Sequence, residues 1–185
     1  MEVQVDPLSG DETPAAQRSI DEAAQLASAD VHDVPKSPGG VSLCYSCRRL
    51  GGCRMGIVTE SLDDDGVVVS ELSCSAENEG GIQVAHGGWT AGALDELVGH
   101  TTLLRGEFAV TGTLEVRFVK PVPIEVPLIG RAWIESRERR KVFVGASIEL
   151  ASSGAIVASA KAIMVTRDSD HFVKHQRWLQ SQVKP

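Results

Sequence analysis

The stretch "HGGWTAGALDELVG", residues 86–99, has two conflicting properties. Its apolar residues recur at helical intervals, yet it contains four glycines. A glycine inside a helix costs roughly 1 kcal/mol relative to alanine, so a helix with this sequence needs a reason to accept them. The spacing still predicts a helix from about Gly87 to Leu104, the only long helix in the middle of the chain.

The glycines predict a close approach by another part of the backbone. At roughly 100° per residue, Gly88, Gly92, Asp95 and Gly99 fall on one stripe of the helix. A stripe without bulky side chains allows tight packing, and we expect it to lie under a curved sheet. Asp95 would then be buried on this face. Because a buried, unpaired carboxylate is costly, Asp95 is expected to have a partner or a chemical role.

The start of this helix is a second candidate for chemistry. The N–H groups of Gly87 and Gly88 have no partner within the helix, and the helix dipole is positive there. Such groups can hold an anion or a developing oxyanion, or they can form an ordinary helix terminus. His86 could be a cap, a structural histidine or a group that faces a ligand.

Asp95 and His86 cannot act on one small atom from the same helix. Asp95 is nine residues after His86, because 95 − 86 = 9. That separation is about 13 Å along a helix that rises 1.5 Å per residue. If both groups take part in one reaction, they come from different subunits. The sequence therefore predicts a dimer with composite sites.

The flanking segments predict an antiparallel sheet. Apolar runs bounded by turn signals indicate two strands before the long helix and four after it, with a further helix near each end of the chain. One central helix against about six strands is typical of an α+β layer architecture, in which the sheet curls around the helix. The expected strands are 53–62, 66–74, 108–119, 126–136, 141–151 and 155–166, and the terminal helices are 14–29 and 168–182.

Composition excludes some classes of function. The chain has 185 residues, a net charge of −7 and 42% hydrophobic residues, which suit one domain with a substantial core. The acidic balance gives nucleic-acid binding no support. The N-terminus does not resemble a signal peptide and no apolar run could span a membrane, so we expect a cytoplasmic protein. We predict an N-terminal extension over residues 1–40, partly disordered with a short helix, and a domain with a C-terminal helix over 41–185.

Four cysteines are present, and Cys44 and Cys47 form one CxxC pair. A structural zinc site usually needs a second such pair or added histidines, and neither follows here. Zinc binding and a redox role are therefore less favoured than an ordinary turn with reduced thiols, and we predict no metal.

Several motifs resemble one known family. "HGGWTAGALDELVGH" resembles the HGG…D motif of hotdog-fold acyl-CoA thioesterases of the PaaI-like, phenylacetyl-CoA thioesterase type. "CYSCRRLGGCRMGI" is similar to the CxxC-containing opening of the same superfamily, although the usual Asn is absent. "TGTLEVRFVKPVP" resembles a strand of the family, and the segments "RRKVFVGASIEL" and "SSGAIVASAKAIMV" resemble its closing hairpin. The resemblance covers about residues 44–166.

The resemblance implies a hotdog fold, in which a curved antiparallel sheet of about six strands wraps around one long central helix. It implies a homodimer or homotetramer and hydrolysis of an acyl-CoA or acyl-carrier thioester. The Gly87 N–H, with Gly88 nearby, would polarise the thioester carbonyl, and His86 would orient it or the leaving sulfur. Asp95 from the partner subunit would be the general base or the nucleophile. Thr111 would position the water or the acid.

The resemblance also suggests where the substrate lies. Trp89 would narrow the acyl pocket, Glu96 is a further substrate-side candidate, and the basic residues Arg139, Arg140 and Lys141 could meet the nucleotide of coenzyme A. No cofactor is expected, since coenzyme A is part of the substrate. Strand alternation puts Thr111 on the face opposite the apolar residues unless a bulge reverses it. The alternatives are a non-catalytic acyl-CoA-binding protein and a hotdog dehydratase or hydratase.

Overall fold

The structure is a computed structural model that describes residues 34–168 and 170–182. The described residues 34–168 belong to one compact unit, and helix α4, His171–Gln182, belongs to another. The predicted helix at 14–29 lies outside the described residues, while the predicted C-terminal helix is present as α4. The division into residues 1–40 and 41–185 stays a prediction.

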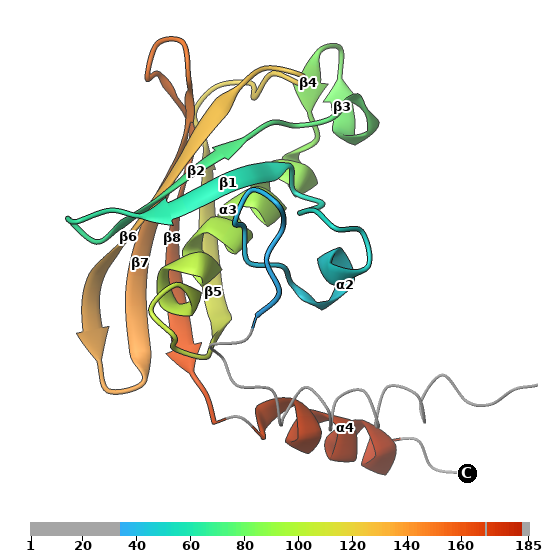
Figure 1. Cartoon of the computed structure of the whole chain (residues 1–185), viewed down its shortest axis with the longest axis vertical. Helices are drawn as coiled ribbons and strands as arrows, with labels where there is room; N and C mark the ends of the chain where they lie inside the picture. The colour runs from blue at the N-terminus through green and yellow to red at the C-terminus, as the bar shows by residue number, and fades with distance from the viewer. Residues whose placement is uncertain (1–33, 169, 183–185) are drawn as a thin grey trace, which may run out of the picture. The chain divides into compact units, whose positions relative to one another are not determined.

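A single six-stranded antiparallel sheet organises residues 34–168, as predicted. Its strand order is β1-β2-β6-β7-β8-β5, and it curves across the long helix α3, Gly87–Leu103 (Figure 1). The strands are β1 Ile57–Leu62, β2 Val67–Leu72, β5 Ala109–Phe118, β6 Leu128–Glu138, β7 Lys141–Leu150 and β8 Ile156–Thr166. All six predicted strands are therefore present within two to four residues of their expected ends.

The core lies between the sheet and α3. Alternate residues of the strands face the helix, where they meet the buried side chains of Ala93, Leu94, Leu97 and Val98. The closest approach is made by a glycine of the sheet. A Cβ added to Gly130 in β6 would lie 2.7 Å from both methyl carbons of Leu97. Gly130 therefore gives Leu97 the space that it occupies.

The expected contact between the helix glycines and the sheet is wrong. A Cβ added to Gly92 would meet Met55 Sδ at 3.0 Å, and Met55 lies in the connection before β1. A Cβ at Gly99 would meet nothing within 4 Å. The connecting segment therefore packs on the stripe at Gly92, and nothing packs closely at Gly99. The sheet contacts the helix mainly through the larger apolar residues of the helix.

Short elements that the sequence did not predict precede α3 in the chain. They are helix α2 Tyr45–Arg48, the 3-10 helix η2 Ala76–Asn78, and the two-stranded sheet of β3 Glu79–Gly81 and β4 Val84–Ala85. Gly80 of β3 packs so closely on His86 that an added Cβ would lie 2.6 Å from the His86 Cα. This small hairpin therefore fixes the position from which α3 begins.

Candidate active site

His86 caps α3 with its own side chain. Its Nδ1 accepts a hydrogen bond from the Gly88 N–H at 2.9 Å, and its backbone N–H donates to the Asn78 carbonyl at 2.7 Å. An imidazole nitrogen that accepts carries no proton, so the proton of the neutral ring is assigned to Nε2. The exposed His86 ring therefore offers an Nε2–H donor at the start of the helix.

The two glycine N–H groups at this helix start are not equivalent. The Gly88 N–H is occupied by His86, whereas the Gly87 N–H makes no hydrogen bond within the part of the chain that the structure describes. The Phe118 ring, 58% exposed, lies 3.6 Å from the position of a Cβ on Gly87. The Gly87 N–H is therefore available as a donor, and it lies beside the exposed ring of Phe118. Phe118 was not among the site residues predicted from the sequence.

Asp95 and Thr111 come together through an irregularity in β5. Thr111 pairs with Met164 and Thr113 with Ile163, so Gly112 is an extra residue in the strand. This β-bulge turns Thr111 to the face of α3, opposite to the face that strict alternation gives it. There Thr111 Oγ1 donates to Asp95 Oδ1 at 2.8 Å. The simple alternation argument for Thr111 is corrected by the bulge.

Asp95 is exposed, not buried as the stripe argument suggested. The helix turns its carboxylate toward β5, the edge strand of the sheet. Within one chain, Asp95 and Thr111 form one pair, and His86 and Gly87 form another. The two pairs are separated by about 13 Å along α3, so a single subunit does not unite them.

Glu96 belongs to a buried ionic network. Its Oε2 lies 3.5 Å from His100 Nε2, and His100 Nδ1 is hydrogen-bonded to Glu60 Oε2. Burial lowers the pKa of His100, but the hydrogen bonds to the two glutamates outweigh it and raise that pKa to about 9. Burial also acts to raise the pKa of Glu60, yet its bonds to His100 and to the Ser42 N–H keep that pKa below its usual value. The network ties α3 to β1.

The remaining predicted substrate residues lie at opposite ends of the helix. Trp89, in the first turn, is 5% exposed, and its indole N–H has no acceptor among the described residues. Arg139 and Arg140 form the turn between β6 and β7, and Lys141 begins β7. The neighbouring Arg137 pairs with Glu107, which follows the end of α3, at 2.7 Å. The basic turn is therefore remote from His86 of the same chain.

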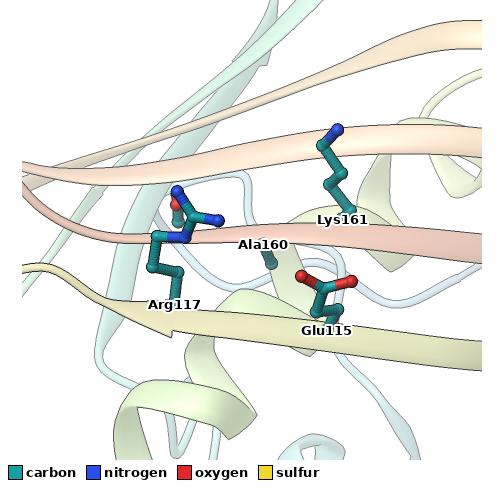
Figure 2. A pocket seen from close by; sticks show the side chains of 5 residues that line it. Glu115, Arg117, Ala160 and Lys161 are labelled. Carbon is teal, nitrogen blue, oxygen red and sulfur yellow. The ribbon is translucent and has the colours of Figure 1, made fainter.

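A shallow pocket lies on the other face of the sheet. It is lined by β5 and β8, where Glu115 pairs with Lys161 and Arg117 with Ser159 across the strands (Figure 2). The bulge separates these side chains from Thr111, which faces α3. Within residues 34–168 and 170–182, no three His, Cys, Asp or Glu side chains are arranged to hold a metal ion. None of the described helices is long and apolar enough to cross a membrane.

Comparisons with known proteins agree with this geometry. Residues 82–156, which contain both candidate pairs, match the family model of the thioesterase superfamily. No curated protein gives a significant match to the chain.

Solved structures give the fold. A hypothetical thioesterase from Streptococcus pneumoniae TIGR4, crystallised with coenzyme A, is 19% identical, with a TM-score of 0.54 over 59% of this chain and 84% of that one. A Streptococcus mutans UA159 protein bound to acetyl-CoA is 18% identical, with a TM-score of 0.53 over 59% and 87%. A Ralstonia eutropha JMP134 protein, described as a putative thioesterase related to phenylacetic acid degradation, is 22% identical, with a TM-score of 0.55 over 69% and 93%. The predicted hotdog fold is confirmed, and the matched family model agrees with the predicted resemblance to thioesterases.

Proposed function

We propose that this chain is a member of the thioesterase superfamily, whose family model matches residues 82–156, and that it hydrolyses acyl-CoA thioesters. The observation that carries the proposal is the Thr111–Asp95 hydrogen bond at the exposed edge of the sheet. Thr111 donates to Oδ1 of the carboxylate and so fixes its orientation, which leaves Oδ2 for a water molecule. The bulge brings Thr111 to this carboxylate, and this supports a chemical role for Asp95.

We propose that the thioester carbonyl binds at the start of α3. The Gly87 N–H and the His86 Nε2–H are the two donors there, and the positive end of the helix dipole adds to their effect. Water attacks the carbonyl carbon while Asp95 takes its proton, and the negative charge moves to the carbonyl oxygen. The carbon–sulfur bond then breaks, and Asp95 returns the proton to the sulfur of the leaving thiol. Direct attack by the Asp95 carboxylate is the alternative first step.

A composite site follows from the place of β5 in the sheet. β5 is an edge strand of 10 residues, and its free edge can pair with a second copy of itself. If two copies of β5 pair in the antiparallel direction about a twofold axis, Thr111 near the start of one strand lies close to Phe118 at the end of the other. Thr111 holds Asp95 and Phe118 adjoins Gly87, so each site takes Asp95 from one subunit and Gly87 from the other. We propose a homodimer on this basis, with a homotetramer as its further assembly.

The substrate-binding residues are proposed in the same arrangement. The acyl group lies against Trp89, whose buried indole N–H still lacks an acceptor. The turn Arg139–Lys141 of the subunit that supplies Asp95 meets the nucleotide of coenzyme A. Glu96 acts less directly, because it is bound to His100. The proposed reaction uses no cofactor, and we propose that it takes place in the cytoplasm.

The direct test is the release of free thiol from short, medium, long and aromatic acyl-CoAs. We expect wild type to hydrolyse at least one of them and Asp95→Asn to lose that turnover while it still binds the ester. Glu71→Gln is the control, because it alters an exposed carboxylate on the far face of β2. Equal turnover by wild type and Asp95→Asn contradicts the role of Asp95. No turnover with tight binding across the panel supports a non-catalytic acyl-CoA-binding protein instead.

Mixing two inactive variants tests the composite site. His86→Ala and Asp95→Asn each disable one half of every site. Subunit exchange between them creates mixed dimers with one intact site, so roughly a quarter of the wild-type activity should return. If the mixture stays as inactive as its components while exchange is verified by mass, the two halves lie within one subunit and the proposal is wrong.

A further inference from the structure

Three of the four cysteines gather in the segment that leads into β1. Cys44 is the N-cap of α2, and Cys47 is the third residue of that short helix. The Arg48 N–H donates to the Cys44 carbonyl at 3.1 Å, which closes the first turn. Residues three apart on a helix lie on the same face, so the turn brings the two side chains together.

The two side chains are neighbours at the start of α2, and the Cys44 thiol acts to raise the pKa of Cys47. The Arg54 N–H donates to Cys47 Sγ at 3.3 Å. Cys44 is half-buried and Cys47 is buried, so only the first is open to a reagent in solution. Cys53 is near enough that its charge would act on Cys47, but no hydrogen bond joins the two.

We propose that Cys44 and Cys47 form a redox-active dithiol, which small-molecule disulfides oxidise to an intramolecular disulfide. The Cys44 thiolate attacks one sulfur of the small disulfide, and the first small thiolate leaves and takes a proton. Cys47 then loses its proton to solvent and attacks Cys44 Sγ, which releases the second small thiol. Two protein thiols are oxidised, and one small disulfide is reduced to two thiols.

The surroundings of Cys47 favour the oxidised state. Burial raises the pKa of Cys47 to about 11 against the opposing effect of the Arg54 N–H, and the Cys44 thiol raises it further. A thiol that stays protonated gives the reduced pair no thiolate stabilisation, so the equilibrium with a small disulfide lies further toward the protein disulfide. Burial, with a contribution from nearby Glu96, also raises the pKa of Cys53, which makes Cys53 a poor competitor for Cys44.

The dithiol lies at the start of the segment that covers α3. Ten residues separate Cys44 from Met55 at positions 45–54, and Met55 packs against Gly92 of the helix. A disulfide across the first turn of α2 would therefore form at the start of this segment, on the N-terminal side of Met55.

Peptide mass spectrometry tests the proposal on the folded full-length protein. The protein is equilibrated with an excess of oxidised glutathione, alkylated with iodoacetamide and digested with trypsin. Residues 37–48 form one tryptic peptide with both cysteines, and Cys53 lies in the separate peptide 50–54. We expect peptide 37–48 to lose two hydrogen atoms and to escape alkylation, while Cys53 is alkylated. Reduced dithiothreitol should restore double alkylation.

Two variants serve as controls. Cys44→Ser should leave Cys47 alkylated after oxidation, and Cys53→Ser should form the same disulfide as wild type. Double alkylation of peptide 37–48 in the oxidised wild-type protein would overturn the proposal, as would a bond that joins this peptide to peptide 50–54. Because the decisive measurement uses wild type, a variant that fails to fold does not remove the test.

Discussion

Replacing His100 by glutamine is expected to remove most of the pH dependence of stability between pH 6.5 and 9. In the folded protein His100 is buried between Glu60 and Glu96, and its pKa rises from 6.5 to about 9. A folded-state pKa above the unfolded value means that the native state binds the proton more tightly. This contribution is fully present below pH 6.5 and is lost as the pH rises through about 9.

The size of the effect follows from the shift. One pKa unit corresponds to about 1.4 kcal/mol, so the shift of His100 is worth on the order of 3 kcal/mol of unfolding free energy. Glu60 acts at the other end of the pH range. Its pKa is lowered, so its contribution is present above pH 4.5 and is lost as the pH falls through the folded-state value. Burial raises the pKa of Cys47 to about 11, so the free energy of unfolding also falls as the pH rises above 9. The measurement therefore ends at pH 9.

Urea unfolding followed by circular dichroism at several pH values measures this directly. Wild type should lose on the order of 3 kcal/mol between pH 6.5 and 9, and His100→Gln should show a nearly flat curve. His175→Gln, an exposed histidine on α4, is the matched control and should behave as wild type. Parallel curves for wild type and His100→Gln would refute the reasoning. If the variant does not fold, NMR titration of wild type decides, because His100 should titrate with a pKa of about 9.

Three further predictions concern the site and the packing. Thr111→Val should lower kcat about tenfold, because a hydrogen bond to a charged group is worth roughly 1.5–3 kcal/mol, and Thr113→Val on the outer face of β5 should leave kcat unchanged in the same steady-state assay. Gly130→Ala should lower the free energy of unfolding by about 1–3 kcal/mol through overpacking, whereas Gly99→Ala, with nothing within 4 Å of the added Cβ, should raise it by up to about 1 kcal/mol in the same denaturant titration. Arg140→Ala should raise KM for an acyl-CoA but not for the matching N-acetylcysteamine thioester, which lacks the nucleotide, and an equal rise for both substrates would contradict the proposed contact.

The sequence predicted the layers of this fold because their signals are local and repeated. Alternation along β6, β7 and β8 marks the buried face at every second residue, and helical spacing marks α3 in the same way. Each signal is carried by many residues, so no single exception obscures it. The short elements β3, β4 and α2 carry only two to four residues each, too few for a period to be visible.

The candidate site was less predictable because it depends on single residues in a three-dimensional setting. Gly112 adds one residue to β5 and reverses the face of Thr111, which no alternation rule shows in advance. The predicted burial of Asp95 was also wrong. Asp95 turns outward at the sheet edge, while Glu96 joins a network that includes Glu60, 36 positions earlier because 96 − 60 = 36. Such long-range pairs leave no local pattern.

The bulge at Gly112 has a consequence for how this protein can diverge. Deleting the Val110 codon, with Gly112 then pairing opposite Met164, would restore regular pairing between β5 and β8 and would keep every buried side chain beyond the bulge in place. Thr111 would then lie opposite Val165 and turn away from Asp95, and on the proposed mechanism the carboxylate would lose its orienting partner. A single in-frame deletion therefore separates ligand binding from turnover, and descendants of one ancestor could pass between enzyme and receptor without ever rebuilding the scaffold.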